Sequence, residues 1–304
     1  MGPTKYKKIL VFGGTGFLGN SLIKLLEKID SKITLFSRTT NPRNIEEKYK
    51  SNPNFKIINW NVTDFKLIEE NILNSDCIIN LCGILYENKN DDFFRIHSDF
   101  PSLLGKLSSK YNIDSLIHVS ALGVTEFAES KYSRSKAIGE RKLLENFPKG
   151  KIIRPSLIFG KGDNFFGQFS QMASLSPFLP LISRNTKFQP VFVDDVSKAI
   201  INLLESSKYE ETIFEIGGKF TYTFEDLLKI LLEIKNIKRI LIPLNSKLMM
   251  IPAFFLQHLP KPPFTVDQMK LLKRDNVLEN NLPGLEELGI KPTEMKKVLI
   301  SIYQ

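Results

Sequence analysis

The sequence is poor in cysteine and histidine. Its 304 residues include two cysteines and three histidines. Two cysteines are too few for a disulfide framework, and the histidines lack the spacing of metal ligands, so we expect no metal site. Cys77 and Cys82 share an apolar run and are interpreted as small buried hydrophobic residues, which fits a reducing compartment. His97 and His118 fall in helix and strand patterns and are interpreted as structural.

Long apolar runs are also missing. No apolar stretch approaches the ~18 residues that indicate a membrane-spanning helix. The run Ile9–Phe12 follows three lysines but ends at a glycine, and it is shorter than the apolar core of about 7–15 residues that a secretory signal needs. We therefore expect a cytoplasmic protein, with a peripheral position on the inner face of an energy-transducing membrane as the alternative.

The charge balance is basic, with 42 lysine and arginine residues against 33 acidic residues and a formal net charge of +9. Such a charge favours anionic partners, for example phosphates or anionic lipid. The basic residues are spread along the chain without a basic block or a nucleic-acid module, so nucleic acid is not an expected partner. Hydrophobic residues at 42% and charged residues at 25% exclude a disordered or collagen-like chain.

Short apolar runs alternate with segments of helical periodicity through the first half of the chain. The expected strands are 8–12, 33–36, 55–58, 77–81, 115–119 and 151–153, and the expected helices are 17–29, 64–73, 93–111 and 132–146. This alternation predicts an α/β fold with a parallel sheet that helices cover on both faces. In open sheets of this kind, ligands bind at the carboxyl ends of the strands.

The first expected strand runs directly into a glycine loop, Gly13-Gly14-Thr15-Gly16-Phe17-Leu18-Gly19. A glycine loop between a strand and a helix is typical of dinucleotide sites. Gly13 would allow the tight turn, Gly16 would let the backbone approach a pyrophosphate, and Gly19 would let the helix pack closely on the sheet. Free N–H groups and the helix dipole favour an anion at this place. A glycine-rich turn without a ligand is the alternative.

The end of the second expected strand indicates the coenzyme. The run Phe36-Ser37-Arg38-Thr39-Thr40 lacks the carboxylate with which NAD sites bind the ribose hydroxyls. A guanidinium at this position would pair with a 2′-phosphate. We therefore predict NADP(H) rather than NAD(H), bound through Arg38, with Arg43 as a second candidate. The alternative is that Arg38 is only a solvated loop charge.

A tyrosine and a lysine lie four residues apart in the run Tyr132-Ser133-Arg134-Ser135-Lys136. In a helix this spacing places both side chains on one face. An ammonium near the phenol would lower the pKa of Tyr132 and suit it to general acid or base catalysis. Lys136 could also reach the nicotinamide ribose. Ser120 ends the fifth expected strand, where its hydroxyl would either bond a substrate oxygen or satisfy the strand end.

Together these segments resemble the short-chain dehydrogenase/reductase superfamily in its extended or atypical branch. Within it, the chain is similar to the family of nucleotide-binding accessory subunits of respiratory complex I and their bacterial relatives. The segments that carry the resemblance are the glycine loop from Phe12 to Gly19, Val119–Gly123, Tyr132–Glu140, Arg154–Gly160, Gln189–Val196, Glu215–Gly218 and Asp267–Leu272. The resemblance spans almost the whole chain.

The resemblance implies a doubly wound Rossmann domain at residues 1–160, a smaller α/β lobe at residues 161–304 interleaved with it, and a bound nicotinamide nucleotide, commonly NADP(H). The residues expected to bind the nucleotide are Gly13, Thr15, Gly16, Phe17, Leu18, Gly19, Arg38, Asn61, Val62, Gly83, Lys136 and Pro155. Asn61 stands where the superfamily often has an aspartate near the adenine. Ala121 follows Ser120 where extended members carry a run of serine and threonine.

The resemblance leaves the activity open among three functions. The first is an NADP(H)-binding protein linked to respiratory-chain or quinone metabolism, in which Tyr132, Lys136 and Ser120 would support a reductase. The second is a scaffold or assembly protein whose nucleotide is structural. The third is an NAD-dependent sugar-nucleotide epimerase or reductase. A respiratory complex or a membrane surface would be the partner of the first two.

Three segments of the second half carry further expectations. The run 248–259 is apolar on nearly all sides, and it is either a buried helix, a lid, or a helix that docks on a membrane or partner. The run 163–166 is interpreted as a loop whose aromatic side chains either line the substrate crevice, which we expect to open after residue 153, or pack in the core, with core packing favoured. Asp194 and Asp195 precede a helical pattern at 196–204, and either could cap it.

Overall fold

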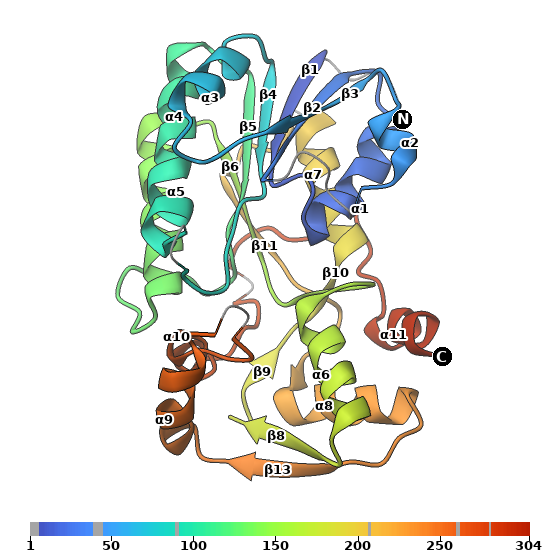
Figure 1. Cartoon of the computed structure of the whole chain (residues 1–304). Helices are drawn as coiled ribbons and strands as arrows, with labels where there is room; N and C mark the ends of the chain where they lie inside the picture. The colour runs from blue at the N-terminus through green and yellow to red at the C-terminus, as the bar shows by residue number, and fades with distance from the viewer. Residues whose placement is uncertain (1–5, 39–44, 89–90, 206–207, 260–261, 280) are drawn as a thin grey trace.

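The computed structural model describes residues 6–38, 45–88, 91–205, 208–259, 262–279 and 281–304. Figure 1 shows a sheet covered by helices above, and a smaller lobe of helices and short strands below. No helix within the described ranges is long and apolar enough to cross a membrane.

The upper part is built on one seven-stranded sheet. In spatial order its strands are β11 (Ile213–Ile216), β6 (Lys151–Pro155), β5 (Ser115–Val119), β4 (Cys77–Asn80), β1 (Lys8–Phe12), β2 (Lys32–Ser37) and β3 (Phe55–Asn59). Every neighbouring pair is parallel. The strand order runs outward from β1 in both directions, so the topological switch point lies between β1 and β4. The α/β fold with a parallel sheet is confirmed.

The seventh strand, β11, is one that the sequence pattern does not predict. It has four residues, and Glu215 interrupts its apolar run. The carboxylate of Glu215 lies 3.4 Å from a guanidinium nitrogen of Arg154 on β6. The positive charge of Arg154 therefore compensates the negative charge of Glu215 within the parallel sheet.

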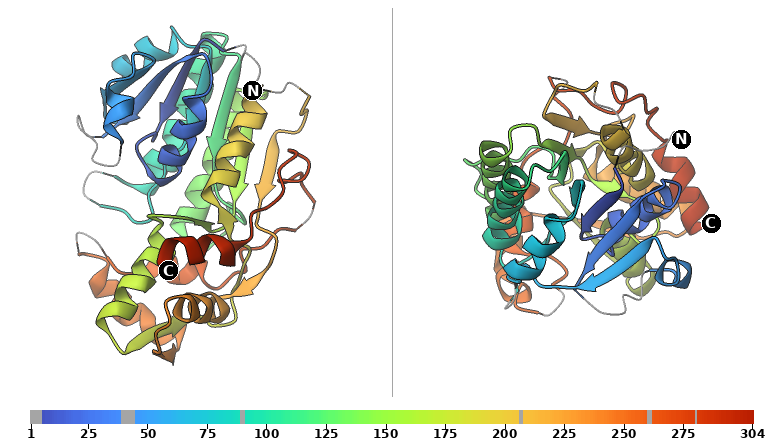
Figure 2. Two further views of the ribbon diagram at one scale, coloured as in Figure 1. Left: turned by 90° about the vertical axis from the view of Figure 1, so that its right-hand side faces the viewer. Right: turned by 90° about the horizontal axis from the view of Figure 1, so that it is seen from above.

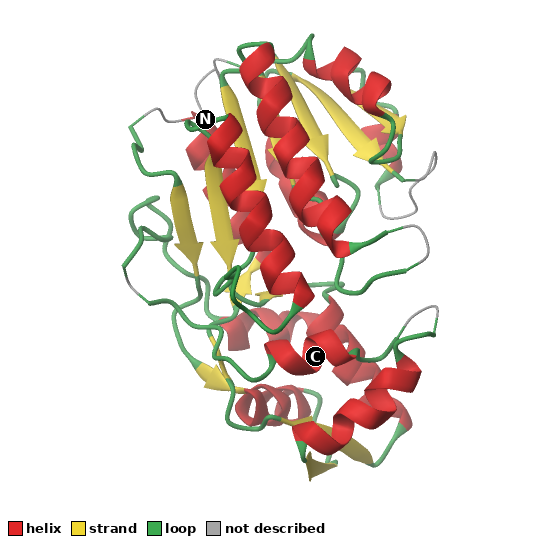
Figure 3. Ribbon diagram, turned by 90° about the vertical axis from the view of Figure 1, so that its left-hand side faces the viewer, coloured by secondary structure: helices red, strands yellow, loops and turns green. Residues whose placement is uncertain are grey.

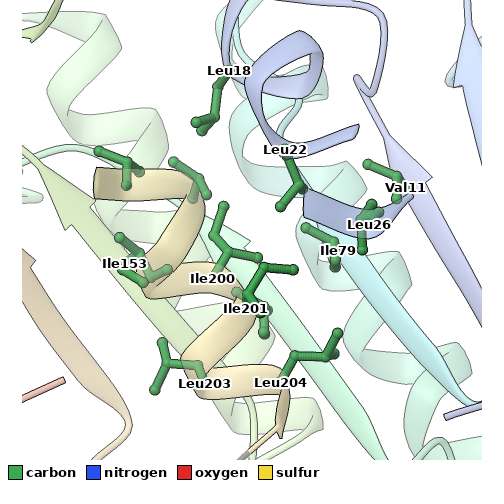
Figure 4. Close-up of a cluster of buried hydrophobic side chains, with 14 of the residues drawn as sticks. Val11, Leu18, Leu22, Leu26, Ile79, Ile153, Ile200, Ile201, Leu203 and Leu204 are labelled. Atoms are coloured by element: carbon green, nitrogen blue, oxygen red, sulfur yellow. The ribbon is translucent and has the colours of Figure 1, made fainter. Parts of the chain in front are cut away.

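Helices cover both faces of the sheet, as Figures 1 and 3 show. One face carries α1 (Phe17–Leu26), α2 (Glu47–Lys50) and α7 (Val193–Glu205), and the other carries α3 (Phe65–Ile72), α4 (Phe100–Lys110) and α5 (Lys131–Asn146). Figure 4 shows how α1 and α7 meet over the sheet through Leu22, Leu26, Ile200, Ile201 and Leu204. The helical spacing of these apolar residues explains why this layer buries one continuous face.

A π-helical turn, η1 (Arg95–Asp99), precedes α4 where the pattern predicts a regular helix over 93–111. A Cβ atom on Gly139 of α5 would collide with the carbonyl oxygen of His97. The widened turn at His97 therefore packs directly against α5, at the position where Gly139 has no side chain. A π-helical turn marks a local departure from regular helix geometry that periodicity alone does not reveal.

The lower lobe consists of three two-stranded sheets and five helices among the described residues. The strand pairs are β7 (Ile158–Phe159) with β10 (Val191–Phe192), β9 (Lys187–Phe188) with β12 (Tyr222–Thr223), and β8 (Phe178–Ile182) with β13 (Ile240–Leu244). The helices are α6 (Asn164–Leu175), α8 (Phe224–Ile234), α9 (Ser246–Leu256), α10 (Val266–Leu271) and α11 (Met295–Tyr303). Figure 2 shows α11, in red, at the junction of the two parts.

The second half returns to the sheet domain, since α7 and β11 belong to its layers. The interleaving of the two units is therefore visible in the chain path. The division near residue 160 stays a prediction.

Two local expectations for the second half are wrong. The run 163–166 is not a loop, because α6 begins at Asn164 and the Asp163 carboxylate accepts hydrogen bonds from the N–H groups of Phe166 and Gly167. The packing of its aromatic residues in the core is confirmed. Helix α7 begins at Val193, so Asp194 and Asp195 lie inside its first turn instead of capping it.

Candidate functional site

The glycine loop between β1 and α1 is a tight turn. Gly13 has a φ of +77°, a value that favours glycine, and its backbone lies close to Leu81 at the end of β4. A Cβ atom on Gly19 would collide with the backbone of Gly14, so helix and strand are in direct contact. Among the residues that the structure describes, no side chain caps the start of α1. The expected roles of Gly13 and Gly19 in the turn and in helix packing are confirmed.

A pocket of about 800 Å³ opens at the carboxyl ends of β1, β2, β3 and β4. The predicted residues that line it are Gly13, Thr15, Gly16, Arg38, Asn61, Val62 and Gly83. The lining residues that the sequence does not single out are Phe36, Ser37, Trp60, Leu81, Cys82, Ile84, Asp91, Ile96 and Phe100. The size falls within the usual range of cofactor pockets, about 300–1,000 Å³. The pocket therefore lies where the sheet topology predicts a ligand site.

Other residues from the predicted binding set lie outside this lining. Leu18 and Gly19 pack inside the α1 layer, and the Phe17 ring faces Gly160. Pro155 is buried at the end of β6, where its carbonyl oxygen accepts a hydrogen bond from the N–H of Leu122 at 2.9 Å. The structure gives these residues packing roles, and their contact with a nucleotide stays a prediction.

Arg38 lies at the rim of the pocket and forms an ion pair that the sequence does not predict. Its Nη1 atom lies 2.9 Å from Oδ2 of Asp91, which follows β4 in the chain. The Arg38 side chain is 71% exposed and that of Asp91 is 14% exposed. Arg43, the second candidate for the 2′-phosphate, lies outside the described residues.

Tyr132 and Lys136 lie on one face of α5, as the spacing predicts. The Nζ atom of Lys136 lies 5.6 Å from the centre of the Tyr132 ring and donates a hydrogen bond to the carbonyl oxygen of Val119 at 3.4 Å. The same Nζ atom lies 3.7 Å from where a Cβ atom on Gly83 would stand. Lys136 thus lies behind the Gly83 end of the pocket, and its ammonium group connects β5, α5 and the segment after β4.

Burial dominates the ionisation of this pair. It lowers the pKa of Lys136 to about 8, although the nearby Glu140 carboxylate acts in the opposite direction. It raises the pKa of Tyr132. The expectation that Lys136 lowers the pKa of Tyr132 is therefore wrong for this arrangement, because desolvation disfavours the phenolate. Tyr132 keeps its proton near neutral pH.

Ser120 is buried just after β5, and its Oγ atom has no hydrogen-bond partner among the described residues. Its backbone N–H donates to the carbonyl oxygen of Ile153 at 2.7 Å. The structure therefore does not support the alternative in which this hydroxyl satisfies backbone groups at the end of the strand. A buried hydroxyl without a partner is costly, and a substrate oxygen would satisfy it.

Comparison with known proteins identifies the family. A model of the NAD dependent epimerase/dehydratase family matches residues 9–217. The chain belongs to this family. The expected resemblance to complex I accessory subunits is also confirmed by similarity to NADH dehydrogenase [ubiquinone] 1 alpha subcomplex subunit 9, mitochondrial. The chain is 31% identical to that protein of Mus musculus over 97% of this chain and 79% of the relative, and 28% identical to that of Dictyostelium discoideum over 96% and 83%.

Solved structures of low sequence identity share the fold. The UDP-glucuronic acid 4-epimerase of Bacillus cereus, solved with NAD and UDP-glucuronic acid, has a TM-score of 0.70 at 20% identity over 97% of this chain and 98% of that one. The dTDP-glucose 4,6-dehydratase of Bacillus anthracis has a TM-score of 0.70 at 19% identity over 98% and 96%. The Rossmann-like sheet with a smaller C-terminal lobe is therefore the architecture of these enzymes too.

His97 links the pocket of this epimerase/dehydratase family member to α5. Its Nε2 atom accepts a hydrogen bond from the N–H of Ile84 at 3.0 Å, so the proton lies on Nδ1, which donates to Oγ of Ser135 at 3.1 Å. The imidazole stacks on Phe93 and meets the edge of the Tyr132 ring. Burial, assisted by the charge of Lys136, lowers the pKa of His97 to about 2. His97 is therefore neutral and serves as a fixed connector.

Asp267 of α10 caps the start of the helix that carries Tyr132. Its carboxylate accepts hydrogen bonds from Oγ of Ser130 at 2.7 Å, from the N–H of Lys131 at 2.7 Å and from the N–H of Tyr132 at 3.1 Å. The smaller lobe thus holds the first turn of α5. The sequence offers no local signal for this contact, because Asp267 lies 135 residues from Tyr132.

Arg154 of β6 is engaged in an ion pair. Its guanidinium binds Glu140 of α5, with Nη2 2.6 Å from Oε2, and its Nη1 atom also lies near Glu215. The Glu140 side chain is 5% exposed. Arg154 therefore joins α5 to the sheet. Removing one partner of such a buried pair typically lowers the free energy of unfolding by about 3–5 kcal/mol.

The buried charge of Lys136 gives a stability prediction with a defined pH dependence. Below pH 8, Lys136 is charged in both states and the folded state bears the desolvation cost. Between pH 8 and 10.5 the folded protein has lost the proton that the unfolded chain keeps, so this cost fades as pH rises. Lys136→Met should raise the free energy of unfolding at pH 7, by roughly 3 kcal/mol at ~1.4 kcal/mol per pKa unit. Urea unfolding at pH 7 and pH 9.5 should show a smaller gain at the higher pH.

The matched control is Lys142→Met, which removes a more exposed lysine from the same helix. It should show no gain that depends on pH. A Lys136→Met protein that is less stable than the parent at pH 7, or a gain that is equal at both pH values, would contradict the assignment of a desolvated ammonium.

Proposed function

We propose that this protein binds NADP(H) and is related in function to the accessory subunits of respiratory complex I, in respiratory-chain or quinone metabolism, with a retained capacity for reduction. The observation that carries the proposal is the pocket of about 800 Å³, which joins a glycine turn, an uncapped helix start and Arg38. Nicotinamide dinucleotides are the ligands of the family, and the arrangement of the residues supports the phosphorylated form.

The residues of the pocket fit a dinucleotide. At Gly13 and Gly16 the backbone carries no side chain at the pocket wall, and a Cβ atom at either position would come within 3.2 Å of neighbouring backbone. The start of α1 offers N–H groups that no side chain in the described part of the chain caps. A pyrophosphate would satisfy these groups and the positive end of the helix dipole. Asn61 and Val62 line the pocket at the end of β3, where an amide can bond an adenine.

The residues around α5 support proton donation. When bound, the nicotinamide would supply the hydride. Burial raises the pKa of Tyr132, so the hydroxyl carries its proton, and a substrate oxygen that gains negative charge as the hydride arrives would accept that proton. The unpartnered Oγ of Ser120 can hydrogen-bond the same oxygen, and Lys136 provides a positive charge near Gly83. These roles suit a reductase, in which the protein donates a proton.

A scaffold role is the second candidate, and the surface of α9 favours it. Ile251, Phe254 and Phe255 are 64%, 56% and 69% exposed, whereas Ala253 is buried. The expectation that this segment is a buried helix is therefore wrong for one of its faces. Exposed aromatic residues of this kind mark interaction surfaces. Since the similar mitochondrial proteins are NADH dehydrogenase subunits, we propose that this face contacts a subunit of a respiratory complex.

The coenzyme preference is tested by Arg38→Ala. Loss of the guanidinium should weaken NADPH binding by about tenfold or more, since a charge-assisted contact contributes about 1.5–3 kcal/mol, and NADH binding should change little. Trp60 is the single tryptophan and lines the pocket, so quenching of its fluorescence reports binding. Arg184→Ala is the control, because Arg184 forms a similar ion pair with Glu225 in the other lobe. An equal loss of affinity for NADPH and NADH would contradict the predicted preference for NADP(H).

The catalytic role is tested by Tyr132→Phe. Removal of the hydroxyl should leave NADPH affinity unchanged and lower any turnover by about 100-fold or more, the usual size of general acid catalysis. Oxidation of NADPH with quinones, aldehydes and sugar nucleotides is the measurement, and Tyr111→Phe is the control. Unchanged turnover in Tyr132→Phe would refute the assignment, and absence of turnover in the parent protein would favour the scaffold.

The contact surface is tested by the double substitution of Phe254 and Phe255 by serine. The variant should lose co-migration with respiratory complexes on native gels while its free energy of unfolding stays within about 0.5 kcal/mol of the parent, as for other surface substitutions. Phe127→Ser removes a 95% exposed phenylalanine elsewhere and serves as control. Flotation with anionic liposomes that depends on the same two residues would instead identify a membrane surface.

A further inference from the structure

The ion pair between Arg38 and Asp91 places both charges at the coenzyme pocket. Nη1 of Arg38 and Oδ2 of Asp91 are 2.9 Å apart, and both residues line the cavity. The end of β2 lacks the carboxylate that would bind ribose hydroxyls. The structure supplies a carboxylate from a different segment, 53 residues farther along the chain.

Asp91 is held in place independently of Arg38. Its backbone N–H donates to Oδ1 of Asn88 at 3.0 Å, and the N–H of Asn88 donates to the Asp91 carbonyl oxygen at 2.9 Å. Nδ2 of Asn88 also donates to Oδ2 of Asp91 at 3.3 Å. The Asp91 side chain is 14% exposed, whereas that of Arg38 is 71% exposed. The contacts of Asp91 with Asn88 do not involve Arg38, so they remain when Arg38 turns toward a phosphate.

We propose that Asp91 is a specificity-determining residue of the coenzyme site, an inference that rests on the proposed nucleotide binding. Its carboxylate accepts a hydrogen bond from a ribose hydroxyl and repels a 2′-phosphate, while Arg38 attracts that phosphate. The two side chains therefore oppose each other in the choice of coenzyme. The site binds both NADH and NADPH, with a smaller preference for NADPH than Arg38 alone would give.

The physical basis is the competition for one guanidinium. A 2′-phosphate that pairs with Arg38 must displace a carboxylate already in contact with it, and it then lies within a few ångströms of that negative charge. A hydroxyl meets no such repulsion, because a carboxylate is an acceptor for its proton. At a separation of about 4 Å in water the repulsion corresponds to roughly a fivefold to tenfold change in affinity.

The experiment compares the dissociation constants of NADPH and NADH for the full chain by quenching of Trp60 fluorescence. Asp91→Asn removes the charge and keeps the shape, and it should tighten NADPH binding by about tenfold while NADH changes less than about threefold. Asp91→Ala removes the acceptor as well, so it should tighten NADPH and also weaken NADH. Asp99→Asn is the control, because Asp99 pairs with Lys142 away from the pocket.

The outcomes separate this inference from the proposed function. If the parent protein binds NADPH and Arg38→Ala weakens it, but both Asp91 variants leave the ratio of the two dissociation constants unchanged, the role of Asp91 is overturned and the nucleotide site stands. If the parent protein binds neither nucleotide, both proposals are overturned. A shift of the ratio toward NADPH in both Asp91 variants, absent in Asp99→Asn, supports the inference.

Discussion

The candidate site depends on one constraint, the close approach of backbone segments in the glycine turn between β1 and α1. Because Gly19 has no side chain, α1 lies directly against the backbone of Gly14. Gly13, with its positive φ, brings the same turn against Leu81. The pocket thus has a wall of backbone rather than side chains. A larger residue at any of these positions would move the helix start away from the place where the proposed nucleotide would present its pyrophosphate.

The helix that carries Tyr132 and Lys136 is held from three directions. Asp267 of the smaller lobe binds its first turn, Arg154 of the sheet binds Glu140 near its middle, and His97 connects it to the pocket wall at Ile84. Lys136 is consequently buried as a charge that lowers stability at neutral pH. Proteins commonly keep such a cost where function requires the group, which fits the roles proposed for this helix. Because Asp267 of α10 accepts a hydrogen bond from the N–H of Tyr132, a displacement of α10 would also shift the backbone at Tyr132.

Much of the sheet domain could be predicted because its elements have strong periodicity. The β1 and β5 ranges agree residue for residue with the expected runs, and the α5 range differs by one residue at its start. Most elements of the second half were not predicted, and β11 and α6 illustrate the reasons. β11 contains Glu215, whose charge is compensated by Arg154 on a neighbouring strand, and the start of α6 shows helical pattern only after its cap. The π-helical turn at His97 reflects its packing against Gly139, a residue of another helix.

The sequence by itself determined the parallel sheet, the glycine turn, the position of Arg38 at a strand end and the common face of Tyr132 and Lys136, because each depends on neighbours within a few residues. Only the tertiary structure decided which charges meet. Asp91 with Arg38, and Asp267 with the start of α5, join residues 53 and 135 positions apart. It also decided that the pKa of Tyr132 is raised, since burial is a property of the packed chain that a lysine one turn away in the sequence does not reveal.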